Sequence, residues 1–243
     1  MLHFFKTHDP DLSKIKIDMH NHIMPNIDDG SSNINESIII SSQLSQWGIS
    51  ETIYTPHIFS DLFTVDSASI SYAFERLMNN KIYFNIYQRH RFAAEYMLND
   101  SFKALLRSGE PLLCLKDNMV LVEFPLHFKN LDTDALLVDL FIAGYQPVIA
   151  HPERYVYLHR SIENYQRLKD MGCYLQLNLF SMGVYYGPEI KVQAEKLLEA
   201  GLIDFISTDM HNTKQLAPLQ KILTSKHWRK WENYSFKNSM FIE

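Results

Sequence analysis

The sequence predicts a single α/β domain built as a parallel barrel of about seven β/α units. Strand-like and helix-like segments alternate along the chain. Several helical segments end at a glycine that is followed directly by a strand-like run. The length of 243 residues is also typical of one α/β barrel. Because each crossover of a parallel sheet must return the chain to the same edge, these observations together favour β/α architecture.

Seven short β-rich runs are the predicted strands. They are rich in β-branched and aromatic residues, and most of them are followed by a histidine or a carboxylate. In chain order they span residues 15–19, 52–55, 91–94, 119–122, 147–150, 174–177 and 205–208.

The helical segments carry recognisable start and stop signals. Asn33 followed by Glu36 resembles a capping box, and Gly48 marks the end of that helix. Three further helices are expected over residues 132–143, 161–171 and 188–200, each with a glycine directly after it.

The ends of the chain differ in character from the barrel of residues 15–224. Residues 1–14 are expected to form an N-terminal arm. Residues 225–243 form an aromatic and basic tail, which we expect to pack on the barrel, with an oligomer contact as the alternative.

Composition and charge argue against several classes of protein. The net charge of −5 disfavours a nucleic-acid partner, and no apolar stretch reaches the ~18 residues of a membrane span. With no export signal expected, the sequence predicts a soluble cytoplasmic protein. A cysteine phosphatase needs an arginine six positions after its cysteine, but Cys114 and Cys173 are followed there by Val120 and Leu179.

Histidines and carboxylates stand directly after the predicted strands. His20 and His22 form a His-x-His pattern, and alternation along a strand points both imidazoles to one face. Taken alone, this pattern is equally compatible with two surface histidines. The other ligand-type residues at strand ends are His57, Glu95, Glu123, His151, Asp209 and His211. Because the ends of parallel strands converge on one rim of a barrel, we expect these side chains to meet.

Five histidines and three carboxylates in this set suit Mn, Fe or Zn better than Ca or Mg. The set can hold two or three ions, and a multinuclear site activates water and stabilises a phosphoryl group under attack. Hydrolysis is therefore the predicted reaction class. For Glu123, pairing with a lysine or arginine is the structural alternative.

Two further features near these strand ends have both a functional and a structural interpretation. Arg154 follows His151 by three residues and is a candidate phosphate-binding group, with a salt bridge to Glu153 or another surface carboxylate as the alternative. Asp28 and Asp29 precede a glycine, which is first of all a turn signal, although either carboxylate could reach the metal site.

An ordered set of motifs resembles the polymerase and histidinol phosphatase (PHP) superfamily. Within it, the chain is most similar to the bacterial capsular-polysaccharide protein-tyrosine phosphatases of the CpsB/YwqE kind, over residues 16–212. The motifs are Asp18-Met19-His20-Asn21-His22, Pro25 with Asp28-Asp29-Gly30, Thr55-Pro56-His57, Val122-Glu123-Phe124, Ala150-His151-Pro152-Glu153-Arg154-Tyr155 and Ser207-Thr208-Asp209-Met210-His211-Asn212.

The resemblance implies a distorted (β/α)7 barrel with three divalent metal ions, foremost Mn, with Fe, Zn or Mg as alternatives. It implies that the first ion is held by His20, His22, Glu95 and Asp209, the second by Glu95, Glu123 and His151, and the third by His57 and His211.

The resemblance also implies a metal-dependent phosphotyrosine phosphatase in which Arg154, Glu95 and His211 serve catalysis and Arg154 binds phosphate. Relatives often carry a second arginine after the last histidine, where this chain has Lys214 as a candidate substitute. The implied partner is a bacterial tyrosine kinase with a tyrosine-rich tail that controls capsular or exopolysaccharide export.

Two other functions remain open on the sequence. One is a small-molecule phosphomonoesterase of the histidinol-phosphate type, and the other is a non-catalytic, metal-stabilised docking module. A phosphotyrosine pocket also needs apolar walls, for which core packing is the structural alternative. The candidate wall residues are Tyr54, Phe59, Tyr96, Phe124, Tyr155, Tyr185 and Tyr186.

Overall fold

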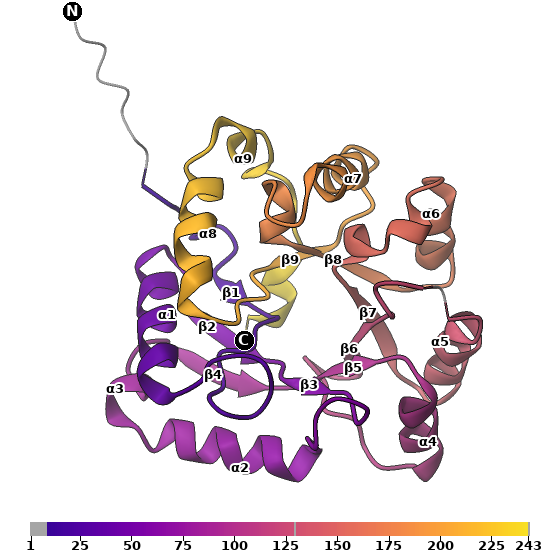
Figure 1. Ribbon diagram of the computed structural model, residues 1–243, viewed down its shortest axis with the longest axis horizontal. Helices are drawn as coiled ribbons and strands as arrows, with labels where there is room; N and C mark the ends of the chain where they lie inside the picture. Colours follow the sequence, from indigo (N-terminus) through magenta and orange to yellow (C-terminus); the bar gives the residue numbers. More distant parts are fainter. Residues whose placement is uncertain (1–8, 129, 243) are drawn as a thin grey trace, which may run out of the picture.

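Parallel strands occupy the centre of the molecule in the computed structural model, which describes residues 9–128 and 130–242 (Figure 1). Within these residues the strands form a three-stranded and a six-stranded parallel sheet. The smaller sheet has the order β1 (Ile17–Asp18), β2 (Glu51–Tyr54), β4 (Arg89–Phe92). The larger sheet has the order β3 (His57–Ile58), β5 (Glu95–Met97), β6 (Met119–Glu123), β7 (Gln146–Ala150), β8 (Tyr174–Asn178), β9 (Phe205–Ser207).

Helices surround the strands (Figure 1). The α-helices are α1 (Ile34–Gln46), α2 (Ser67–Met78), α3 (Lys81–Phe84), α4 (Asp100–Ser108), α5 (Thr133–Ile142), α6 (Glu163–Asp170), α7 (Pro188–Glu199), α8 (Leu216–Leu223) and α9 (Lys226–Trp231). The 3-10 helices are η1 (Pro152–Arg154), η2 (Val156–Leu158), η3 (Leu179–Met182), η4 (Thr213–Gln215) and η5 (Asn238–Phe241). Among the described residues, none of these helices is both long and apolar enough to cross a bilayer.

The helices predicted from start and stop signals are confirmed. Asn33 caps α1 by accepting hydrogen bonds from the backbone of Asn35 and Glu36. The four glycines expected to end helices have positive φ angles, as a left-handed C-cap requires: Gly48, Gly144, Gly172 and Gly201. The expected second half of the capping box, a hydrogen bond from the Asn33 backbone N–H to the Glu36 side chain, is wrong, however. The Glu36 carboxylate accepts hydrogen bonds from Ser32 and Thr213, so it ties α1 to the loop after β9.

Two of the predicted strands, at residues 52–55 and 91–94, are each followed by a second short strand that the sequence did not predict. β2 continues into β3 across Pro56, which has no backbone N–H to donate to a ladder. The predicted strand at residues 91–94 begins earlier, at Arg89, and resumes as β5 after Ala94. β2 pairs with β4 and β3 pairs with β5, so the same two segments stay adjacent on both sides of the interruption.

Side-chain hydrogen bonds join the first and last strands. Only one parallel bridge, between Asn21 and Met210, is recorded between these segments in the described part of the chain. The Ser207 hydroxyl accepts a hydrogen bond from the backbone N–H of His20 at 2.9 Å and donates to the Asp18 carboxylate. Backbone hydrogen bonds from the Asp209 N–H to His20 O and from the His22 N–H to Met210 O, both at 2.8 Å, accompany the bridge. Within the described residues the strands are recorded as two sheets and not as one closed sheet.

Alternation along β6 separates an inner from an outer core. Met119 and Leu121 belong to the smaller of two buried clusters, which side chains of several strands form together, whereas Val120 and Val122 belong to the large core beneath the helices. Glu123 is the next residue of the inward series. The period-2 pattern thus places a carboxylate at the carboxyl end of the strand on the inner side.

The C-terminal segment covers the opposite end of the inner core. Phe241 is fully buried, and its ring centroid lies 4.9 Å from that of Phe205. The Asn238 amide donates to the backbone oxygens of Ile17 and Ile206, at the beginning of β1 and within β9. Of the arm and tail inferred from the sequence, residues 1–8 and 243 lie outside the described residues, and the division into arm, barrel and tail stays a prediction.

Candidate metal centre

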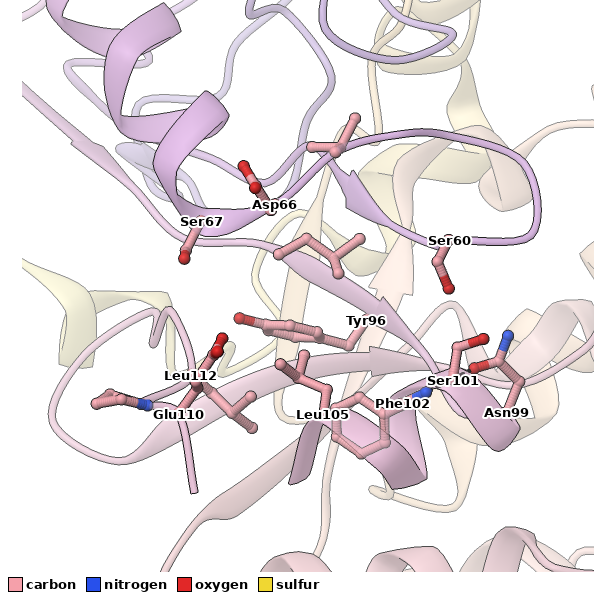
Figure 2. Close-up of a pocket in the computed structure, with 13 residues that line it drawn as sticks. Ser60, Asp66, Ser67, Tyr96, Asn99, Ser101, Phe102, Leu105, Glu110 and Leu112 are labelled. Carbon is pink, nitrogen blue, oxygen red and sulfur yellow. Dashed lines mark hydrogen bonds between the residues drawn. The ribbon is translucent and has the colours of Figure 1, made fainter. Parts of the chain in front are cut away.

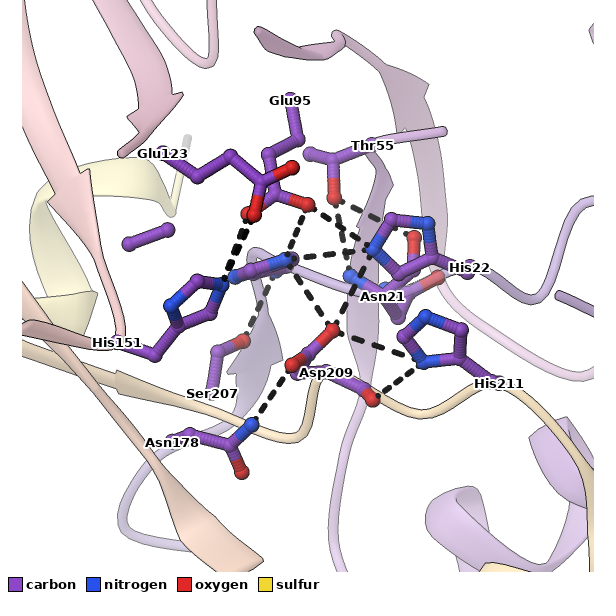
Figure 3. Close-up of polar contacts among 12 residues, drawn as sticks. Asn21, His22, Thr55, Glu95, Glu123, His151, Asn178, Ser207, Asp209 and His211 are labelled. Atoms are coloured by element: carbon purple, nitrogen blue, oxygen red, sulfur yellow. Dashed lines mark hydrogen bonds and ion pairs between the residues drawn. The ribbon is translucent and has the colours of Figure 1, made fainter. Parts of the chain in front are cut away.

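Ligand-type side chains meet at the carboxyl ends of the strands (Figure 3). They come from segments far apart in the sequence, which the parallel topology brings to one rim. We call this set the ligand cluster: His20, His22, His57, Glu95, Glu123, His151, Asp209 and His211.

Glu95 is at the centre of the cluster. Its Oε2 lies 3.2 Å from His20 Nε2, 3.3 Å from His22 Nε2 and 3.2 Å from His57 Nδ1. Its Oε1 lies 3.1 Å from His151 Nε2. One carboxylate therefore faces four imidazoles from three different segments, an arrangement suited to bridging two cations.

Asp209 faces two of the same imidazoles, those of His20 and His22, and also that of His211. Its Oδ1 lies 3.4 Å from the Nε2 atoms of both His20 and His22 and 3.6 Å from His211 Nδ1. Burial raises the pKa of Asp209 and of Glu95, but the surrounding imidazoles, with His20 foremost, together outweigh burial and lower both pKa values. Both carboxylates are thus held in the ionised form that ligates cations.

The donor atoms fit divalent metal ions. The Oε2 atom of Glu95 and the Nδ1 atom of His57 are buried and have no hydrogen-bond partner among the described residues, although they lie 3.2 Å apart. Buried polar atoms of this kind are costly unless something satisfies them, and a cation between them would do so. In the described residues, four overlapping groups of three or four ligand atoms each lie within 4.8 Å of one another. Mixed imidazole and carboxylate ligation of this kind suits Mn, Fe or Zn.

Asp28 and Asp29 take different positions, which the sequence left open. Asp29 Oδ1 lies 3.6 Å from His57 Nε2 and 3.7 Å from His211 Nε2, so it joins the group formed by His22, His57 and His211. Asp28 instead accepts hydrogen bonds from His22 Nδ1 at 2.7 Å and from the His57 backbone N–H at 3.0 Å. Burial raises the pKa of Asp28, but His22 and His57 outweigh it and lower it to about 2.

Two polar residues of β8 form hydrogen bonds with members of the ligand cluster, and they were not identified from the sequence as part of the site. Gln176 Oε1 lies 2.8 Å from His20 Nδ1, and the Asn178 amide donates to Asp209 Oδ2 at 2.7 Å. A hydrogen bond at Nδ1 orients the ring so that Nε2 faces the cluster. The signal was present, since both residues are polar at alternate positions of an otherwise largely apolar strand.

The backbone is bent sharply at two of the ligands. His151 has φ of 34° and Asp209 has φ of 51°, in the left-handed region that residues other than glycine rarely adopt. Such conformations cost roughly 1–3 kcal/mol each and persist where the surrounding structure holds them. Both bends occur where a strand ends and its side chain turns into the cluster.

Arg154 lies beside the cluster and is mostly covered, with 20% of its side chain exposed. Its Nη1 donates to Asp209 Oδ2 at 3.2 Å, and its guanidinium carbon lies 4.4 Å from the centre of the Tyr186 ring. The alternative partner, Glu153, instead accepts hydrogen bonds from Asn178 and Ser181. The buried carboxylate of Asp209 therefore holds this cation at the rim of the cluster.

The cluster opens into a cavity of about 410 Å³, which we call the site cavity. Phe59, Leu62 and Phe63 line one part of it, and the Phe63 ring stacks on His57 with an interplanar angle of 7°. Tyr185 and Tyr186 also line it. The site cavity thus combines a charged floor with aromatic and aliphatic walls.

Several candidate wall residues lie elsewhere. Tyr96 lines a second cavity of about 200 Å³, beside the first turns of α2 and α4 (Figure 2). Tyr54, Phe124 and Tyr155 are buried core residues. The bulk of these rings explains their burial, so the core alternative holds for all four.

Lys214 and the two cysteines do not line the site cavity. Lys214 is exposed in η4, while its neighbour Gln215 lines the cavity and accepts a hydrogen bond from the His211 backbone at 2.6 Å. Cys114 is partly buried and Cys173 is buried, and burial raises the pKa of the Cys173 thiol to about 12. A thiol with such a pKa stays protonated and does not act as a nucleophile near neutral pH.

Comparison with known proteins identifies a family and agrees with the architecture. Residues 16–241 match the family described as capsular polysaccharide synthesis, CpsB/CapC. The chain is 31% identical over 199 residues to the tyrosine-protein phosphatase YwqE of Bacillus subtilis, covering 82% of this chain and 78% of that protein. It is 28% identical over 209 residues to the tyrosine-protein phosphatase CpsB of Streptococcus pneumoniae, covering 83% and 85%. The chain also matches a solved structure from a description of YwqE of Bacillus subtilis and CpsB of Streptococcus pneumoniae as unique metal-dependent tyrosine phosphatases. The TM-score is 0.75 and the sequence identity 29%, and the match covers 87% of this chain and 89% of that chain.

Proposed function

Because the chain belongs to the CpsB/CapC family of capsular polysaccharide synthesis, we propose that it is a metal-dependent protein-tyrosine phosphatase. The observation that carries the proposal is the convergence of the ligand cluster and Arg154 on the site cavity. A non-catalytic docking module would not need a charged cluster open to a cavity.

The residues divide among three divalent cations, foremost Mn. His20, His22, Glu95 and Asp209 would hold the first, and Glu95, Glu123 and His151 the second. His57 and His211 would hold the third, to which the position of Asp29 adds a carboxylate. When bound, such ions would lower the pKa of a bound water and so supply hydroxide near neutral pH.

Arg154 binds and orients the phosphate. Only Nη1 of the guanidinium donates to Asp209, so its other N–H groups can donate to phosphate oxygens. Its negative partner Asp209 and the face of Tyr186 fix its position before substrate arrives. Together with Glu95 at the centre of the cluster and His211 at the cavity lining, Arg154 forms the catalytic set.

The walls of the site cavity select an aromatic phosphate ester. Phe59, Phe63 and Tyr186 line the same cavity as Arg154, so the phenyl ring of a phosphotyrosine whose phosphate reaches Arg154 would lie among aromatic side chains. Phenolate, with a pKa of about 10, is also a better leaving group than an aliphatic alkoxide. Ring binding and leaving-group chemistry therefore favour tyrosine over serine phosphates.

The substrate would be a phosphotyrosine protein. We propose that this protein is a bacterial tyrosine kinase that controls capsular or exopolysaccharide synthesis. The family's role in capsular polysaccharide synthesis supports this assignment. We also interpret the two sheets as arcs of one distorted (β/α)7 barrel, since the bridge between Asn21 and Met210 brings the first and last strands together.

The test is phosphate release by Mn-loaded protein from phosphotyrosine peptides, phosphoserine peptides and histidinol phosphate. We expect turnover of phosphotyrosine peptides well above the other two, lost on treatment with a chelator and restored by Mn. Efficient hydrolysis of histidinol phosphate with no release from phosphotyrosine would instead identify a small-molecule phosphatase.

A further inference from the structure

A further, largely apolar depression, distinct from the cavity beside Tyr96, lies next to the site cavity, and we call it the lateral groove. It has a volume of about 550 Å³ and lies between the segment after η3, α7, α8 and the start of α9, which are neighbours in Figure 1. Its lining residues are Met182, Gly183, Val184, Tyr185, Lys191, Ala217, Pro218, Lys221, Ile222, Ser225 and His227, and no carboxylate is among them.

The lateral groove is continuous with the site cavity through one aromatic residue. Tyr185 lines both depressions, and 44% of its surface is exposed. Its ring centroid lies 4.9 Å from that of Tyr186, which in turn lies 4.4 Å from the Arg154 guanidinium carbon. A phosphate held by Arg154 is therefore within roughly three residues of extended peptide from the groove, at about 3.3 Å per residue.

The groove carries positive charge in a protein whose net charge is −5. Lys191 and Lys221 line it, and neither forms an ion pair within the described part of the chain. The carboxylate of Glu195 on α7 lies 2.6 Å from Nε2 of His227. Two free ammonium groups thus flank an apolar surface.

The walls of the groove are firmly packed. Gly183 approaches α8 so closely that a Cβ atom there would lie 2.7 Å from Ile222 Cγ1. Met182 is buried beneath the groove, while Val184 at its edge is 68% exposed. A ligand would therefore meet a largely preformed surface, which lowers the entropic cost of binding.

We propose that the lateral groove binds the polypeptide that flanks the phosphotyrosine, and that it favours an apolar residue accompanied by an acidic one. The inference rests on the proposed phosphatase function. The apolar side chain would cover the surface formed by Val184, Ala217 and Ile222, while the acidic side chain would pair with Lys191 or Lys221. The groove would thereby distinguish among phosphotyrosine proteins that the site cavity alone treats alike.

The test compares three substrates on Mn-loaded protein. The first peptide carries Glu and Leu two and three residues from the phosphotyrosine on both sides, the second carries Ser at those positions, and the third substrate is para-nitrophenyl phosphate. We expect Lys221→Glu to lower kcat/KM about three- to tenfold for the Glu/Leu peptide, chiefly through KM, because it replaces an attraction with a repulsion. Ala217→Trp fills the groove, so it should likewise lower kcat/KM for the Glu/Leu peptide. Neither variant changes turnover of para-nitrophenyl phosphate.

The matched control is Lys196→Glu, which makes the same charge change on α7 outside the groove lining. Equal losses for Lys221→Glu and Lys196→Glu, or equal kcat/KM of the native protein for both peptides, would overturn the groove assignment and leave the phosphatase function standing. If the native protein releases phosphate from none of the three substrates, the proposed function itself fails, and the groove assignment fails with it.

Discussion

Replacing Gln176 with Leu should weaken metal binding without unfolding the protein. Gln176 does not belong to the ligand cluster, but its Oε1 lies 2.8 Å from Nδ1 of the fully buried His20. When Nε2 of His20 binds a cation, the proton of the neutral ring is on Nδ1. In the variant this Nδ1–H group has no acceptor. An unsatisfied buried donor costs about 1–3 kcal/mol, which corresponds to about five- to 150-fold in affinity. This range agrees with the 10- to 100-fold typical of losing such an outer hydrogen bond.

Metal content after dialysis and Mn titration of activity measure the effect. Gln176→Glu retains an acceptor for His20 and should keep metal affinity close to that of the native protein. The control is Gln193→Leu, which removes a buried glutamine from α7 outside the ligand cluster. If Gln176→Leu binds Mn as tightly as Gln176→Glu, the inferred role of this hydrogen bond is refuted.

Three further changes test other parts of the molecule. Arg154→Lys keeps the charge but loses the guanidinium fork, and we expect kcat/KM for a phosphotyrosine peptide to fall about 10- to 100-fold with metal content unchanged; an unchanged kcat/KM would exclude Arg154 as the phosphate ligand. Hydrogen bonds from Thr213 and Ser32 lower the pKa of Glu36 from 4.5 to about 2, so its stabilising contribution is full above about pH 4.5 and is lost as the pH falls through 2. The difference in unfolding free energy between native protein and Glu36→Gln should therefore shrink as the pH falls over this interval, and a constant difference would contradict the assignment. Phe241→Ala should cost about 3–5 kcal/mol, or about 6–20 °C in Tm by calorimetry, whereas Phe128→Ala at an exposed site should change Tm little; equal shifts would contradict the role of Phe241 in the inner core.

The strands and several helices were predictable because their signals are local. Alternation and helix caps depend on neighbouring residues, and the glycines after α1, α5, α6 and α7 have the positive φ that a C-cap needs. The same kind of signal marks α4, where Asn99 caps the start and Gly109 the end. α3 also has a capping residue, Asn80, but it spans only four residues, so it depends on contacts with α1 and α2 for its stability.

The site was predictable to the extent that topology determines it. Parallel strands place their carboxyl ends together, so residues at strand ends could be grouped without coordinates. Which atoms face one another could not be predicted in this way. The separate positions of Asp28 and Asp29 depend on how one turn folds over His22 and His57, and the support from Gln176 depends on strand pairing. Burial of Tyr96 away from the site cavity likewise depends on packing by α2 and α4.

Stability and chemistry are separated along the axis of the strands. At the amino ends, Phe241 packs against Phe205, and Asn238 joins β1 to β9 where no ladder is recorded in the described residues. At the carboxyl ends, the same seam is held by Asp18 and Ser207, directly before two segments that carry ligands. A loss of packing at the amino end should therefore lower Tm while the metal-loaded protein, well below that temperature, keeps its kcat. A matching fall in kcat for Phe241→Ala would mean instead that the C-terminal segment sets the geometry of the ligand cluster through the strands.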